Sequence, residues 1–352
     1  MSLSNKHLEQ GAVVAADGIP LHYGDEKAEY HAALEQAVLM DRSHEGRLIS
    51  SGRDRLAVIQ RISTNDVVNM GTGRGKPTIL TNPTGRIIDR LMIYDRGDTA
   101  LITTEPGRGQ AVQHYLQRQI FFNDEMRIED LSGQTQLFTL HGPKSIDVLK
   151  ALGVEYDDTQ GFAAKTLSIG NVEIILLERK ALSWAQWAII APTPAAEAVW
   201  SAILEAGQSA GIRPAGSLTF NVLRIRAGRP GIGRELSTDF IPLEAGLWDE
   251  VSFSKGCYTG QEIIARMESR NRLAKTIVKL ELEQIISAPT KLFIEGKDAG
   301  ILTSSVTTPD GEHLGVGFVK PAFAEVGRVL YTADANVPVR IKELAGSQPP
   351  QL

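Results

Sequence analysis

A chain of 352 residues with 42% apolar and 22% charged side chains is too long for one ordinary core and predicts two or three globular domains. The net charge of −5 gives no overall field for binding nucleic acid, and the single cysteine excludes an internal disulfide. No run of about 18 uninterrupted apolar residues exists to span a bilayer. The N-terminal residues lack the features of a signal or transit peptide, so we expect a cytoplasmic protein without membrane contact.

The greater part of the chain alternates between helical and strand-like spacing of its apolar residues. Asn82-Pro83-Thr84-Gly85, for example, is typical of a hairpin turn between two strands. The expected helices cover residues 27–40, 55–62, 108–119, 143–152 and 194–210, with a further one through Leu218, Val222 and Ile225. The expected strands cover residues 78–81, 86–94, 172–178 and 184–191.

The pattern changes at Leu273, where six short runs rich in β-branched residues begin, separated by Gly or Pro turns. Such runs predict a small antiparallel barrel. We therefore place the main domain boundary near Asn271, which gives the regions 1–271 and 272–352.

Common catalytic and metal-binding motifs are missing from the sequence. GTGRGKPT at 71–78 lacks the spacing of a phosphate-binding loop. The histidines form neither HxH nor HExxH, and one cysteine cannot make a CxxC clamp, so no metal site is predicted. His44 and His141 lie beside loops, where each is either an acid–base group or a polar side chain satisfied by the backbone.

One segment, KGCYTGQE at 255–262, differs from the rest. Its two glycines allow a tight turn and a close approach to another segment, and Gln261 and Glu262 begin a short helix. Cys257 comes just before that helix and two residues after Lys255, and both features favour the thiolate. Cys257 is therefore a candidate reactive or metal-ligating sulfur, with a small buried apolar residue as the alternative.

The octapeptide resembles the signature of the YgfZ family, folate-binding proteins related to the T-protein (aminomethyltransferase) of glycine cleavage. Similarity to the T-protein continues in the same order from about residue 20 to 340. It is carried by LMDRSHEGRLISSGRDRLAVIQRISTNDV (39–67), LTNPTGRIIDRLMIY (80–94), LHGPKS (140–145), LRIRAGRPGIGREL (223–236), IPLEAGLWDEVSFSKGCYTGQE (241–262) and AGILTSS (299–305).

This resemblance implies an α+β fold of the T-protein type. Two ferredoxin-like subdomains would occupy residues 1–271, and an antiparallel β-barrel would follow at 272–352. The family arranges these parts as a three-lobed ring with tetrahydrofolate in its central channel. Tetrahydrofolate or a derivative is therefore the expected cofactor.

The resemblance also marks two departures from the T-protein. Where the T-protein has two adjacent aspartates after the hairpin turn, the second of them functional, this chain has Asp89 and Arg90. A guanidinium stays protonated near neutral pH and cannot exchange a proton there. The acidic folate ligand of the RTGYTGE-like segment is also missing from ERKALSWAQWAII at 178–190. T-protein-type aminomethyl transfer is therefore not expected, although Asp89 could still face the pocket.

The remaining features suit a folate-binding site. Arg224, on the arginine of the LRxxAG motif, is the expected partner of the anionic glutamate tail. The pterin would pack on Trp187 or Tyr94, although core packing is an alternative for Trp187. The other predicted cofactor-binding residues are Arg90, Tyr258, Gln261 and Glu262.

Two functions of different class are compatible with these residues. In the first, the protein is a folate-dependent accessory factor that supports assembly or repair of iron-sulfur clusters, including those of tRNA-modifying enzymes. Its partners would be iron-sulfur enzymes or their assembly proteins, with no direct nucleic acid contact. Cys257, Lys255 and Asp89 would be its working groups. In the second, the protein is an aminomethyl or one-carbon transferase with an altered acid–base set.

Overall fold

The computed structural model describes residues 3–155, 162–182, 184, 186–269, 273–333 and 336–348. The chain forms two compact units. Unit 1 comprises Met1–Ile59, Val67–Lys76 and Leu91–Phe220, and unit 2 comprises Gln60–Asp66, Pro77–Arg90 and Asn221–Leu352. The predicted boundary near Asn271 lies outside the described residues, and the division into 1–271 and 272–352 remains a prediction.

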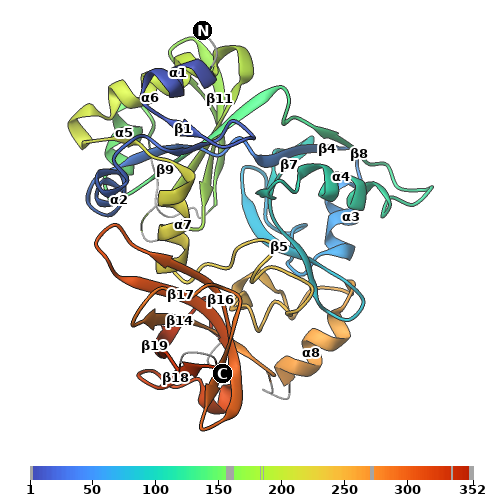
Figure 1. Cartoon of the computed structure of the whole chain (residues 1–352). Helices are drawn as coiled ribbons and strands as arrows, with labels where there is room; N and C mark the ends of the chain where they lie inside the picture. The colour runs from blue at the N-terminus through green and yellow to red at the C-terminus, as the bar shows by residue number, and fades with distance from the viewer. Residues whose placement is uncertain are drawn as a thin grey trace. The chain divides into compact units, whose positions relative to one another are not determined.

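A six-stranded sheet of order β10-β11-β12-β9-β3-β13 runs through unit 1 (Figure 1). Its neighbouring strands are antiparallel except for the parallel pair of β3 and β13. On one face, Phe138, Leu140 and Ile189 pack with Trp200 of helix α6. The elements of this layer are β3 (Val38–Asp41), β9 (Thr135–His141), β10 (Ala164–Ile169), β11 (Val172–Arg179), β12 (Gln186–Pro192), β13 (Arg213–Pro214), α5 (Ser145–Ala151) and α6 (Ala196–Ala206).

The other face of the same sheet forms a second core within unit 1. Leu137, Leu177 and Ala188 cluster with Tyr94 and Leu101, which come from a five-stranded sheet of order β5-β6-β7-β4-β8. Because side chains alternate across a strand, β9 and β12 contribute to both cores. The elements are β4 (Glu45–Ser51), β5 (Gly75–Thr81), β6 (Ile87–Asp95), β7 (Thr99–Pro106), β8 (Arg127–Asp130) and α4 (Gly109–Gln117), preceded by α1 (Leu3–Glu9), β1 (Val13–Val14), β2 (Pro20–His22) and α2 (Glu26–Glu35).

The C-terminal part of unit 2 is a closed antiparallel barrel of order β14-β17-β16-β15-β18-β19, with β19 pairing back to β14 (Figure 1). Leu280, Leu292, Leu302 and Ile341 fill its interior. The α+β class and the predicted barrel are therefore confirmed. The strands are β14 (Thr276–Leu282), β15 (Thr290–Ile294), β16 (Lys297–Thr307), β17 (His313–Val319), β18 (Val329–Thr332) and β19 (Pro338–Leu344).

A second apolar cluster in unit 2 covers the outside of this barrel. Ile79, Ile87 and Ile225 pack with Phe240 and Phe318, whose rings stack with centroids 3.5 Å apart. The cluster joins the hairpin of β5 and β6 to the barrel through residues that all belong to unit 2. Helices α3 (Arg55–Ile62), α7 (Ser217–Arg226) and α8 (Gln261–Ser269) complete the chain, with short 3₁₀ turns at Thr193–Ala195, Gln208–Ala210, Trp248–Glu250 and Pro321–Phe323.

One predicted element is wrong in part. The helix expected over 27–40 ends with α2 at Glu35, and Val38–Asp41 is the strand β3. Val38, Leu39 and Met40 are buried between β9 and β13, and a strand covered on both faces needs consecutive apolar residues. The apolar spacing that predicted the end of the helix belongs instead to this buried strand.

The octapeptide crosses the hairpin turn of unit 2 at a glycine. Gly260 has φ +83°, and a Cβ there would lie 2.6 Å from the Asn82 carbonyl oxygen and 2.8 Å from the Gly85 Cα. Gly256, by contrast, has open space around its Cα. The close backbone approach predicted for this segment therefore occurs at its second glycine.

We expect Gly260→Ala to lower the free energy of unfolding by more than about 1–2 kcal/mol, because the left-handed backbone and the backbone clash both oppose a Cβ. The matched variant Gly256→Ala should change it by less than about 0.5 kcal/mol. Urea unfolding followed by circular dichroism measures both. Equal effects of the two substitutions would contradict the close packing of Gly260 on the turn.

Candidate functional site

The octapeptide is anchored by Lys255. Its Nζ donates hydrogen bonds to the carbonyl oxygens of Gln60 (2.5 Å), Ser63 (2.6 Å) and Asn65 (3.0 Å), at the end of α3. Burial lowers the pKa of Lys255 to about 8, against the opposing charge of Asp66. These bonds direct the ammonium to backbone carbonyls and fix the segment at this point.

Two further residues of the octapeptide continue this anchoring. The ring of Tyr258 is buried among Leu243, Trp248 and Ile264, and burial raises its pKa to about 12. Gln261 begins α8 as predicted.

Cys257 is a free, exposed thiol. The segment therefore holds an accessible sulfur on a backbone that is fixed on both sides. Glu262 is exposed and pairs with Arg266 one helical turn later (2.6 Å).

Asp89 and Arg90 lie in the hairpin of unit 2 and are both buried. The Arg90 guanidinium donates through Nε and Nη2 to the two carboxylate oxygens of Glu250, each at 2.7 Å. Glu250 is fully buried. The side chain of Asp89 accepts a hydrogen bond from the backbone N–H of Arg90 (3.1 Å). Arg90 is thus part of a buried, bidentate ion pair with Glu250.

Arg224 also has a buried acidic partner. Its Nη1 lies 3.5 Å from Glu235, and its Nη2 donates to the Ser304 hydroxyl (3.1 Å). Glu235 is fully buried and accepts further hydrogen bonds from Thr303, Ser304 and the Gly231 N–H. The guanidinium predicted to hold a folate carboxylate is therefore already committed to a carboxylate of unit 2.

The aromatic residues predicted to stack a pterin lie inside unit 1. Tyr94 is fully buried, and its hydroxyl donates to the Glu178 carbonyl oxygen (2.8 Å). Trp187 is 3% exposed and belongs to the core under α6. Core packing is the role that the structure gives both rings.

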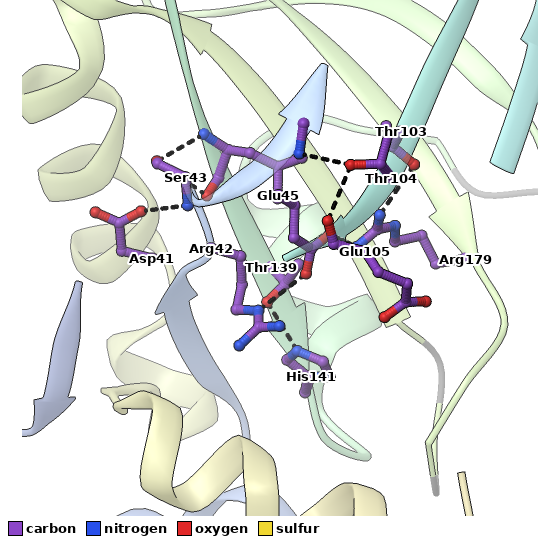
Figure 2. Close-up of polar contacts among 12 residues, drawn as sticks. Asp41, Arg42, Ser43, Glu45, Thr103, Thr104, Glu105, Thr139, His141 and Arg179 are labelled. Carbon is purple, nitrogen blue, oxygen red and sulfur yellow. Dashed lines mark hydrogen bonds and ion pairs between the residues drawn. The ribbon is translucent and has the colours of Figure 1, made fainter. Parts of the chain in front are cut away.

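A polar cluster that the sequence did not predict joins β4, β7 and β11 in unit 1 (Figure 2). Glu45 accepts hydrogen bonds from Arg42 Nε (2.9 Å) and Arg179 Nη1 (2.7 Å). Arg179 also donates to the Thr103 hydroxyl (3.0 Å). All three charged side chains are less than 10% exposed. We call Arg42, Glu45 and Arg179 the Arg–Glu–Arg cluster.

Several polar and aromatic side chains surround the Arg–Glu–Arg cluster. The Arg42 guanidinium lies over the Phe220 ring, 3.7 Å from its centroid, and Phe220 also contacts His141 edge-on. His141 Nε2 lies 2.8 Å from the Thr139 hydroxyl. Gln186 is the cross-strand partner of Arg179. These residues come from segments far apart in the sequence.

Burial and charge set the ionisation states in this cluster. Burial by itself would raise the pKa of Glu45, but Arg179 and Arg42 hold it well below its usual range. Burial and the charge of Arg42 lower the pKa of His44 to about 4, so its imidazole is neutral at pH 7. The only signal in the sequence was the density of charged residues in the loop DRSHEG at 41–46, between two apolar runs.

Metal and membrane sites find no support in the described part of the chain. No group of three His, Cys, Asp or Glu side chains among those residues could hold a metal ion. None of the helices placed there is long and apolar enough to cross a membrane.

Comparisons with known proteins agree with this architecture. Residues 4–255 match the family described as the GCVT N-terminal domain. A chloroplastic protein of Arabidopsis thaliana named as a transferase is 30% identical over 349 residues, which are 97% of this chain and 79% of that protein. An aminomethyltransferase of Desulforamulus reducens is 28% identical over 97% of this chain and 95% of its own.

A solved structure shows the same fold. The crystal structure of glycine cleavage system aminomethyltransferase T from Bartonella henselae superposes with a TM-score of 0.84 at 22% identity, covering 97% of this chain and 95% of the other. The sequence match and the shared fold give one conclusion: the chain belongs to the GCVT N-terminal domain family, in the T-protein (aminomethyltransferase) superfamily.

Proposed function

We propose that this protein binds tetrahydrofolate or a derivative and, as a member of the YgfZ branch, supports assembly or repair of iron-sulfur clusters, including those of tRNA-modifying enzymes. The observation that carries the proposal is the ion pair of Arg90 and Glu250. From the resemblance to the T-protein we expect Arg90 at the position of the functional aspartate. Its Nε and Nη2 both donate hydrogen bonds to Glu250. T-protein chemistry would lack its acid–base group at this position.

The neighbouring aspartate does not replace the lost one. Asp89 is fully buried, and its carboxylate accepts from the backbone of Arg90. A general base must reach the proton that it abstracts, within about 3 Å or through one water. In this arrangement neither member of the Asp89-Arg90 pair offers an accessible carboxylate.

Membership of the superfamily and one feature of unit 1 support folate binding. The residues predicted from the resemblance fit poorly, because Arg224 is committed to Glu235 and the rings of Tyr94 and Trp187 are buried. The Arg–Glu–Arg cluster fits better, since its surroundings retain buried polar atoms, His44 Nδ1 and Gln186 Oε1, that have no hydrogen-bond partner within the described part of the chain. Folate, when bound, would supply one-carbon chemistry at its pterin nitrogens. The cluster would bind and orient its polar groups.

The exposed thiol supports the accessory role. Lys255, Tyr258 and Gly260 fix the octapeptide, while Cys257 between them stays accessible. A fixed backbone presents the sulfur in one orientation, which suits contact with a partner protein or with a cluster as cargo. The link to iron-sulfur proteins comes from the YgfZ resemblance of this segment.

The second candidate is an aminomethyl or one-carbon transferase. It is favoured by the aminomethyltransferase of Desulforamulus reducens, which is similar over nearly the whole of both chains. The two candidates differ in one measurable property. The transferase would turn over an aminomethyl donor with tetrahydrofolate, and the accessory factor would not.

Calorimetry with the intact protein should show tetrahydrofolate binding, and assays with the glycine-cleavage partner proteins should show no cleavage of an aminomethyl donor above background. Arg90→Asp should not create activity either, because it places a second carboxylate beside buried Glu250. Absence of binding by folded protein would remove the folate half of the proposal, and turnover by the unmodified protein would favour the transferase.

The Arg90–Glu250 pair should be tested by its effect on stability. Arg90→Met leaves Glu250 buried without its partner, so we expect a loss of about 3–5 kcal/mol in the free energy of unfolding. Arg90→Met combined with Glu250→Leu should recover most of that loss, because it removes both charges. Urea unfolding measures each variant. A double variant no more stable than the single one would contradict the pairing.

Cys257→Ala should fold and bind folate as the unmodified protein does, because the thiol is exposed. In cells that lack the protein, this variant should fail to restore iron-sulfur enzyme activity, while Gly256→Ala should restore it. Iodoacetamide should label the native thiol readily. Full restoration by Cys257→Ala would assign the octapeptide a purely structural role.

A further inference from the structure

The Arg–Glu–Arg cluster buries one more positive charge than negative charge. Glu45 accepts from one nitrogen of each arginine, so a single carboxylate serves two guanidinium groups. Among the described residues, Glu45 is the acid that pairs with Arg42. At Arg179 burial lowers the pKa, but Glu45 and, to a lesser extent, Glu105 raise it. Asp41 binds His7 (3.0 Å) and the Ser43 N–H (2.9 Å). A buried guanidinium that shares its carboxylate with a second guanidinium is only partly compensated, which favours an anion at this point.

Arg42 has a free hydrogen-bonding edge. Its Nε donates to Glu45, whereas its two Nη nitrogens find no hydrogen-bond partner in the part of the chain that the structure describes. The side chain is only 5% exposed. Phe220 packs 3.7 Å beneath the guanidinium and fixes its plane. The result is a planar two-donor fork held in one orientation, the geometry that a carboxylate accepts in bidentate fashion.

The neighbouring strand supplies an acceptor. Gln186 stands opposite Arg179 in the register of β11 and β12, so both side chains lie on the same face of the sheet. The Gln186 side chain is 2% exposed, and its Oε1 is buried without a partner among the described residues. Leaving a buried acceptor unsatisfied is costly, so a ligand that carries an N–H group would stabilise it.

We propose that Arg42, with Gln186 as the acceptor beside it, binds the carboxylate of a ligand that carries an N–H group near that carboxylate. The glutamyl tail of folate has this chemistry, and in that form the inference rests on the proposed function. A free amino-acid-like carboxylate would share the same chemistry. Phosphate suits the site less well, since it carries no N–H group for the Gln186 Oε1.

Calorimetric titrations of the full-length protein with three probes test this assignment. The probes are p-aminobenzoylglutamate, which is the folate tail, 6-methyltetrahydropterin, which has no carboxylate, and glutarate. Arg42→Gln should weaken binding of the tail about 10- to 100-fold and leave binding of the pterin unchanged, because a charge-assisted hydrogen bond is lost. Arg53→Gln, at a guanidinium with a 72% exposed side chain in the same unit, is the matched control and should bind all three probes normally.

The outcomes separate this inference from the proposed function. Equal affinity of Arg42→Gln and the unmodified protein for the tail and for glutarate overturns the carboxylate site, even if folate binds. Binding of glutarate through Arg42, without any binding of tetrahydrofolate or the pterin, supports the site with a free carboxylate as its ligand and removes the folate proposal. If Arg42→Gln does not fold, Arg42→Lys keeps the charge beside Glu45 but loses the fork. It should still bind the tail several-fold more weakly, and unchanged affinity would overturn the inference.

Discussion

The cost of burying an ionised carboxylate organises the polar interior of this protein. Glu45, Glu235 and Glu250 are each at most 5% exposed, and each is matched by arginine. A buried charge is tolerated only with a partner in good geometry, and removal of that partner is strongly destabilising. The hairpin, α7 and the loop at 41–46 therefore cannot shift without breaking one of these pairs.

The same constraint decides which arginines have hydrogen-bond donors left for a ligand. Arg90 lies against a carboxylate that occupies two of its nitrogens, and Arg224 shares its donors with Glu235 and Ser304. Arg42 is different, because it shares the carboxylate of Glu45 with Arg179. Its two Nη nitrogens have no hydrogen-bond partner among the described residues. Of these three arginines, the one with donors left for an anion among the described residues is therefore Arg42, which the family resemblance did not single out as a ligand.

The octapeptide follows a second physical rule, that of backbone fit. Gly260 approaches the hairpin turn so closely that only a residue without Cβ can stand there, and Lys255 binds three carbonyl oxygens at the end of α3. These contacts account for much of the segment's composition on structural grounds. Cys257 is the residue that they leave unexplained, which is why the accessory role depends on it.

The sequence by itself determined most elements and the C-terminal barrel, because period-two and helical spacings of apolar residues are local properties. Its blocks also carried the T-protein resemblance. It misplaced the end of α2, because Ala37 to Met40 fit either a helix face or a strand buried on both sides, and only pairing with β9 decides between them. Tertiary structure alone brought Arg42, Glu45, Arg179 and Gln186 together. These residues are up to 144 positions apart, and charge pairing across such separations leaves no periodic signal in the chain.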